Sequence, residues 1–104
     1  MTTHAAHTLR FIAKPGTADE LVAVFAQALP YILEDTTTVS WFVGRSEDDP
    51  ATFVLAHAFV DEAARSAHFE SPAAKLIMTE GAPFFASDPA IENFSVIAGS
   101  KAKG

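Results

Sequence analysis

The sequence predicts an α+β domain built on one antiparallel sheet, and three observations support this class. First, its 104 residues suffice for a single domain, expected over residues 1–104 with an ordered core at about 8–98 and loose termini. Second, segments with strand and helix patterns follow in the order strand, helix, strand, strand, helix, strand. Third, an acidic turn before Pro50 joins two of the strand segments as a hairpin, which pairs them antiparallel. This order is typical of a ferredoxin-like sandwich, a four-stranded antiparallel sheet with two main helices on one face.

The first strand is expected at residues 8–14, where a Pro-Gly pair ends it. Thr17 and Glu20 have the spacing of a capping box, which predicts that the Thr17 hydroxyl accepts a backbone N–H at the start of a helix. Pro30 falls late in this helix and removes a hydrogen bond, so a kink or break is expected over residues 26–30. The buried face of the helix is predicted to consist of Leu21, Phe25, Leu29 and Ile32, with Val22 and Leu33 at its edges.

Turn residues divide the second half of the chain into short elements. Asp61 is a suitable cap for a helix that runs to about Glu70, and Pro72 fits the first position of a further turn or two ending near Gly81. The other expected elements are strands at 39–45 and 52–60 joined by an acidic turn at 47–50, a loop at 82–89 and a last strand at 91–98.

The third strand shows why a partner is expected. Phe53, Leu55 and Phe59 share one of its faces, whereas Val54, Ala56 and Ala58 share the other. Two helices cover one face of the sheet only, so the second face needs another cover. A homodimer that packs two sheets face to face meets this need. A monomer with a large apolar surface is the alternative, although such surfaces are rare on monomers.

Composition excludes several functions. The net charge is −6 with seven Lys and Arg, so a nucleic-acid partner is not expected. There is no cysteine, which excludes disulfides and thiolate metal sites and agrees with a reducing compartment. Neither a membrane-length apolar stretch nor a secretory signal is found, so a cytoplasmic protein without membrane contact is expected. His4 and His7 are placed in or near the loose N-terminus, and no metal-ligand cluster is predicted.

The stretch 52–72, TFVLAHAFVDEAARSAHFESP, resembles the antibiotic biosynthesis monooxygenase family of dimeric α/β-barrel proteins. Members carry a strand of the type F-V-L-x-E-x-W, then D-E-x-A, a histidine on the helix, and S/T-P. The Pro-Gly pair at 15–16 and the acidic turn before Pro50 also match, and the resemblance extends from Thr8 to Ile97. It implies a dimeric α/β barrel, in a superfamily that includes cofactor-free quinol monooxygenases, isomerases and haem-degrading enzymes.

The resemblance also implies a pocket between the sheet and the helices. His68 falls on the family's helix histidine, and His57 falls where many members have a glutamate. Phe59 replaces a common tryptophan, and Trp41 stands where tyrosine or phenylalanine is common. The chain departs from some enzymatic members, because residues 27–30 hold no Asn or His late in the first helix.

The candidate catalytic residues are His57 and His68, since an imidazole titrates near neutrality and can act as a general base. His57 is alternatively a core histidine with a hydrogen-bond partner, and His68 is alternatively a helix cap. The candidate substrate-binding residues are Trp41, Phe59, Phe25 and Arg10; Trp41 equally suits the core, and Arg10 equally suits a solvated strand end.

The function expected from these residues and from the resemblance is a cofactor-independent monooxygenase that acts on a small, quinol-like aromatic molecule. No flavin, haem or metal is expected. The alternative is a dimeric small-molecule-binding or stress-related protein without catalysis, or an isomerase on the same scaffold.

Overall fold

The structure is a computed structural model that describes residues 4–99. The elements are β1 (Ala5–Ile12), α1 (Ala18–Leu33), β2 (Thr38–Arg45), β3 (Thr52–Phe59), α2 (Glu62–Ala67), the 3₁₀ turn η1 (His68–Glu70), α3 (Pro72–Glu80), the 3₁₀ turn η2 (Ala82–Phe84) and β4 (Ala90–Ser95). The predicted order and class are confirmed. The predicted last strand ends at Ser95 rather than at residue 98, and the predicted loose residues 1–3 and 100–104 lie outside the described part.

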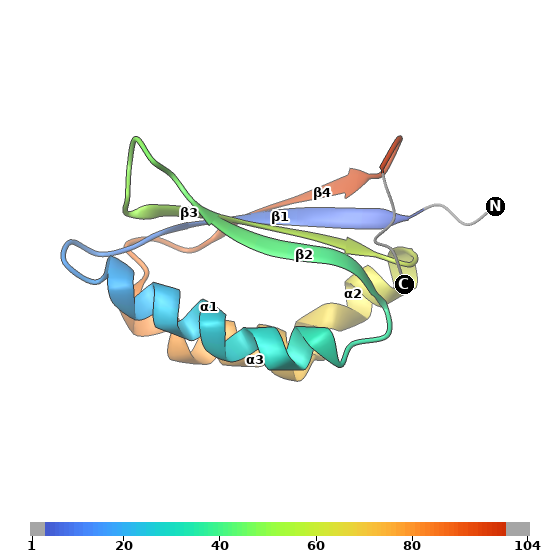
Figure 1. Ribbon diagram of the computed structural model, residues 1–104, viewed down its shortest axis with the longest axis horizontal. Coiled ribbons are helices and arrows are strands. Elements are labelled where there is room, and N and C mark those ends of the chain that lie inside the picture. Colours follow the sequence, from blue (N-terminus) through green and yellow to red (C-terminus); the bar gives the residue numbers. More distant parts are fainter. Residues whose placement is uncertain (1–3, 100–104) are drawn as a thin grey trace.

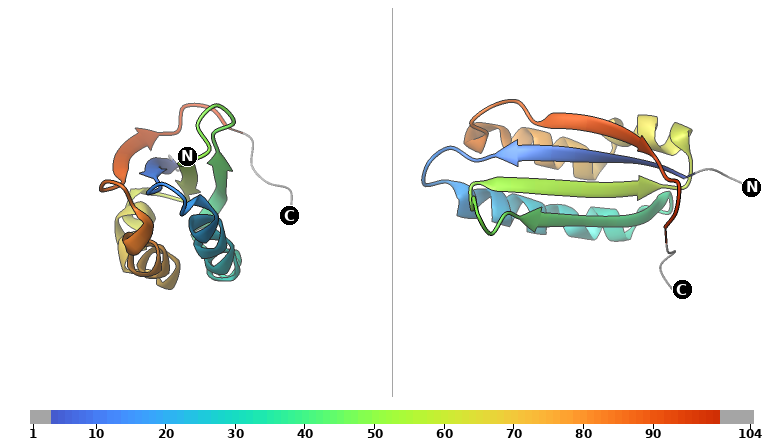
Figure 2. Two further views of the ribbon diagram at one scale, coloured as in Figure 1. Left: turned by 90° about the vertical axis from the view of Figure 1, so that its left-hand side faces the viewer. Right: turned by 90° about the horizontal axis from the view of Figure 1, so that it is seen from above.

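The four strands form one antiparallel sheet in the order β2-β3-β1-β4. All the α-helices lie against one face of this sheet (Figure 1). The view onto the opposite face, on the right of Figure 2, has the strands in front and the helices behind them. This is the predicted ferredoxin-like arrangement, in which one face of the sheet meets helices and the other is left open.

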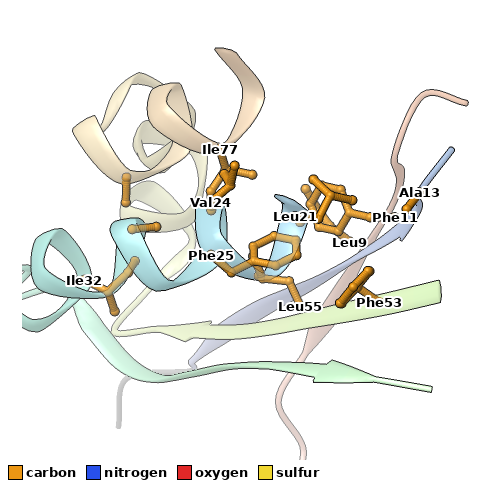
Figure 3. Close-up of a cluster of buried hydrophobic side chains, with 12 residues drawn as sticks. Leu9, Phe11, Ala13, Leu21, Val24, Phe25, Ile32, Phe53, Leu55 and Ile77 are labelled. Carbon is orange, nitrogen blue, oxygen red and sulfur yellow. The ribbon is translucent and has the colours of Figure 1, made fainter. Parts of the chain in front are cut away.

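The core lies between the sheet and the helices (Figure 3). Alternate residues of the two central strands point into it, because the side-chain period of a strand is two. Leu9 and Phe11 come from β1, and Phe53 and Leu55 come from β3. The helical side is supplied mainly by Leu21, Val24, Phe25, Ala28 and Ile32 of α1, with Ala73 and Ile77 of α3.

Helix α1 corrects three expectations. The expected break at residues 26–30 is absent, because the helix continues through Pro30; both Pro30 and Ala26 are exposed, so water can satisfy the carbonyl that loses its bond. The Thr17 hydroxyl donates to the Lys14 carbonyl at 2.8 Å instead of capping the helix. Leu29 is 42% exposed, because Val24 and Ala28 take up the buried face instead.

The caps in the second half agree with expectation. The Asp61 carboxylate accepts from the Ala64 N–H at 2.8 Å and starts α2. The Ser71 hydroxyl accepts from the Ala74 N–H at 3.2 Å and starts α3, with Pro72 in its first turn. The helix expected to run to about Glu70 is divided, because α2 ends at Ala67 and gives way to η1. This division places His68 at the junction.

The face of the sheet away from the helices keeps apolar side chains in contact with solvent. Phe42 of β2 lies opposite Ala56 of β3 and is 61% exposed. Phe94 of β4 and Ile12 of β1 are also exposed, and Val54, Ala56 and Ala58 are only half-buried. The predicted second apolar face is therefore present, and no helix of the described residues covers it. We call it the open face.

Within residues 4–99, the helices are too short or too polar to cross a membrane.

Candidate functional site

Three histidines meet under the end of the sheet where β1 begins. His7 of β1 lies directly opposite His57 of β3, so both side chains point to the helix-covered face. His68 enters from η1. The ring centroids are 5.7 Å apart for His7 and His57, and 4.5 Å apart for His57 and His68. His7 and His68 are 5.9 Å apart. We call these three residues the histidine cluster.

Two hydroxyl groups hold this cluster. The Thr38 Oγ1 lies 2.8 Å from Nε2 of His57, and the Ser71 Oγ lies 3.2 Å from Nδ1 of His68. A hydroxyl oxygen can accept two hydrogen bonds, so Ser71 can accept from Nδ1–H of His68 while it caps α3. In that tautomer the other ring nitrogen of His68 is a proton acceptor. Within the described residues, Nδ1 of His7 and Nδ1 of His57 are buried without a partner.

Burial keeps the imidazoles of the cluster uncharged. The pKa of His57 is lowered to about 3, first by burial and then by the neighbouring His68 and His7. The pKa of His7 is lowered to about 4, first by burial and then by His68 and Arg65. Burial also lowers the pKa of His68, and the Asp35 carboxylate opposes this change. All three rings are therefore neutral at physiological pH.

A pocket of about 360 Å³ opens beside the cluster. It is lined by Tyr31, Glu34, Asp35, Thr37, Ala64, Ala67, His68, Ser71, Pro72 and Ala73. His68 belongs to its wall, whereas His57 is 1% exposed and lies one ring behind. A molecule in this pocket would meet His68 first. The volume falls in the range of small-molecule sites.

The structure brings some predicted site residues to this place and leaves others elsewhere. Phe59 stacks on His57 with centroids 3.8 Å apart, and Trp41 lies opposite His57 on β2 and packs against the core. Phe25 lies in the middle of the core, 5.2 Å from Phe11 between ring centroids. Arg10 is exposed on the open face, on the other side of the sheet from the cluster. It therefore does not contribute to the pocket.

His7 is a correction. We expected it near a loose N-terminus, but β1 begins at Ala5 and His7 is 1% exposed inside it. The sequence could have predicted that the strand includes His7, because Ala5 and His7 continue the alternation of Leu9 and Phe11 towards the N-terminus. Asp35, at the end of the first helix, had no comparable sequence signal. Thr38 and Ser71 also had none, since threonine and serine occur at many strand starts and caps.

The sequence predicted no metal-ligand cluster, but it did not predict that the fold brings three imidazoles together. Even so, no group of three or more His, Asp or Glu side chains in residues 4–99 is placed to hold a metal ion.

Sequence comparison identifies the family. Residues 5–80 match the model of the family described as antibiotic biosynthesis monooxygenase, which is most of the chain. The chain belongs to this family. The matched segment contains all of the histidine cluster and every residue of the pocket wall, and it ends before β4. No curated protein matches the chain significantly.

Several solved structures are similar to this chain. A protein of unknown function from Nitrosomonas europaea is 34% identical, with a TM-score of 0.89 over 99% of this chain and 98% of that one. A candidate antibiotic biosynthesis monooxygenase from the same organism has 14% identity and a TM-score of 0.85, covering 93% of each chain. Another, from Caulobacter crescentus, has 15% identity and a TM-score of 0.84, covering 93% of this chain and 92% of that one. The last two comparisons show a shared fold.

Proposed function

We propose that this member of the antibiotic biosynthesis monooxygenase family is a cofactor-independent monooxygenase for a small, quinol-like aromatic molecule. The observation that carries the proposal is the pocket of about 360 Å³ with the neutral imidazole of His68 in its wall. A neutral imidazole accepts a proton, which is what activation of a phenol or quinol requires. Family membership adds support.

In the proposed reaction the substrate supplies all the electrons. His68 takes a proton from a quinol hydroxyl, and the electron-rich quinolate reduces dioxygen. One oxygen atom is bonded to the ring and the other leaves as water, so that quinol plus dioxygen gives hydroxyquinone plus water. The protein's task is to hold the proton and to keep bulk water from the reactive intermediate.

His57 acts in this proposal through His68 rather than on the substrate. It was expected to line the pocket, but its ring lies behind that of His68, edge to face at 4.5 Å. Phe59 and Trp41 then form a second layer that fixes His57, while Phe25 supports the core beneath. We therefore assign the proton transfer to His68 and a positioning role to His57.

The proposal includes a homodimer in the cytoplasm. The open face carries Phe42, Phe94 and Ile12 in contact with solvent, and a second copy of the same face is its simplest cover. The absence of cysteine agrees with a reducing compartment.

A second candidate is a binding protein without catalysis, for instance a stress-related one, or an isomerase on the same scaffold. The observation in its favour is that neither His57 nor Trp41 belongs to the wall of the pocket. In addition, residues 27–30 of α1 hold no Asn or His, whereas some enzymatic members of the family present one from the late part of this helix.

Oxygen uptake with 1,4-naphthohydroquinone tests the proposal. We expect uptake above the spontaneous rate and its loss by roughly 10²-fold or more in His68→Gln, the usual effect of removing a positioned base. His4→Gln is the matched control, since His4 lies outside the pocket wall. No acceleration by the native protein, together with binding of the quinol, would favour the binding protein.

A further inference from the structure

The charge of the pocket wall limits what can bind there. Among the described residues of the wall, Glu34 and Asp35 are acidic and none is Lys or Arg. The whole chain carries a net charge of −6, so its long-range field has the same sign. The remaining polar side chains, from Tyr31, Thr37, His68 and Ser71, are uncharged hydrogen-bonding groups or a neutral ring.

Asp35 is the better placed of the two acids. It is half-buried, whereas Glu34 is exposed. Its Oδ1 accepts from the backbone N–H of Thr37 at 2.8 Å and from the Thr37 hydroxyl at 2.6 Å. These bonds fix the carboxylate at the end of α1, and the two acceptor oxygens of a carboxylate have capacity for further donors.

Asp35 also stays ionised. Burial alone would raise its pKa, but hydrogen bonds from Thr37 and Thr38 outweigh burial and hold the pKa below its usual value. His68 acts in the same direction, yet the two side chains form no ion pair within 4.0 Å in the described structure. The pocket thus presents a fixed anionic acceptor on α1's side and an imidazole on the side of η1.

We propose that the pocket selects an uncharged aromatic molecule with a hydroxyl donor and rejects anionic analogues, and that Asp35 determines this selectivity. This inference deepens the proposed function, on which it rests, by naming the charge class of the substrate. A ligand hydroxyl donates to Asp35, and a charge-assisted hydrogen bond of this type is stronger than a neutral one. A sulfonate or carboxylate on the ring meets repulsion without any cationic partner in the wall.

Calorimetric titration of the full chain with two redox-inert probes tests the inference. The probes are 2-naphthol and 2-naphthol-6-sulfonate, which differ by one anionic group. We expect the sulfonate to bind at least about tenfold more weakly at low salt. In Asp35→Asn this ratio should fall to roughly threefold or less, because the amide can still accept from Thr37 but has no charge.

Asp48→Asn is the matched control, since it removes one negative charge at the exposed hairpin turn far from the pocket wall. It should leave the ratio unchanged, and 2-naphthol should shift the imidazole NMR signals of His68 in the native protein. Equal binding of the two probes overturns the inference, as does an identical ratio in Asp35→Asn and Asp48→Asn, or no binding of 2-naphthol.

The experiments can refute the monooxygenase activity and the charge selection by Asp35 independently of each other. Charge selection without any oxidation of naphthohydroquinone refutes the monooxygenase and leaves a selective binding pocket. Oxidation of the quinol without charge selection refutes the role of Asp35 alone.

Discussion

Acid should destabilise this protein through its histidine cluster, and His7→Phe should reduce that sensitivity. The native state holds His7 neutral, with its pKa lowered from 6.5 to about 4 by burial and then by the charges of His68 and Arg65. In the unfolded chain His7 has its ordinary pKa of 6.5 and becomes protonated as the pH falls below that value. Between pH 6.5 and about pH 4 the unfolded state therefore binds more protons than the native state, and the free energy of unfolding falls as the pH falls.

The size of the effect follows from the same shift. Each pKa unit corresponds to about 1.4 kcal/mol, so acidification from about pH 6.5 to about pH 4.5 should cost roughly 2 kcal/mol for His7 alone. His57 also lowers the stability on acidification, because its pKa in the native state is lowered to about 3. The Asp35 carboxylate, whose pKa lies below its ordinary value of 3.8, titrates mainly below this pH window.

Phenylalanine is a suitable replacement at this position. Nδ1 of His7 is buried without a partner in the described structure, so little hydrogen bonding is lost. The side chain also borders a cavity of about 20 Å³, which leaves room for the slightly larger ring. We expect His7→Phe to be at least as stable as the native protein near pH 7.

Urea unfolding at fixed protomer concentration measures the effect, because the unfolding midpoint of the proposed dimer would depend on concentration. The free energy of unfolding should be determined at pH 6.5, 5.5 and 4.5 for both proteins. The loss between the first and last pH should be smaller by roughly 2 kcal/mol in His7→Phe. If the free energy of unfolding fell equally with pH in both proteins, a neutral, buried His7 would be refuted.

Three further changes test other contacts. Thr38→Val removes the hydroxyl 2.8 Å from Nε2 of His57 and should lower the free energy of unfolding in urea by about 1–3 kcal/mol. Thr38→Ser keeps the hydroxyl and should retain most of the stability. Equal losses in the two variants would show that the hydrogen bond contributes little. Pro30→Ala supplies the missing N–H inside α1 and should stabilise the protein by up to about 3 kcal/mol, and a lower melting temperature would contradict the unbroken helix. Phe42→Glu places a charge on the open face and should change the mass by light scattering from about twice 11.1 kDa to 11.1 kDa, while an unchanged mass would place the dimer contact elsewhere.

The fold was predictable because alternation and caps agree with each other along most of the chain. Val54, Ala56 and Ala58 alternate with Phe53 and Leu55, which determines which side of β3 meets the helices. The wrong expectations occurred where the conformational preference of a single residue was outweighed by packing or by access to solvent in the folded chain. Pro30 is a strong helix breaker in isolation, but its lost bond faces water and the packing of Ala28 and Ile32 retains the helix.

The site was less predictable, because it depends on which distant side chains meet. His57 and His68 were identifiable as titratable residues among apolar neighbours. That His68 borders the pocket while His57 lies behind it depends on the division between α2 and η1, which no residue type specifies. Asp35 and Thr38 join the site only because the turn after α1 passes beside η1 and the end of β3.

The divided helix around His68 affects how the buried rings are reached. None of the six residues of α2 is buried. The Asp61 carboxylate caps the start of α2, and the Ser71 hydroxyl caps the start of α3 on the other side of η1. Segments with so few buried apolar contacts have low opening free energies. We therefore expect the amides of residues 62–70 to exchange hydrogen with solvent much faster than those of β1 and β3. Brief openings of this segment would admit solvent and small molecules to His57, so the rate of entry would be set by local unfolding rather than by a permanent channel.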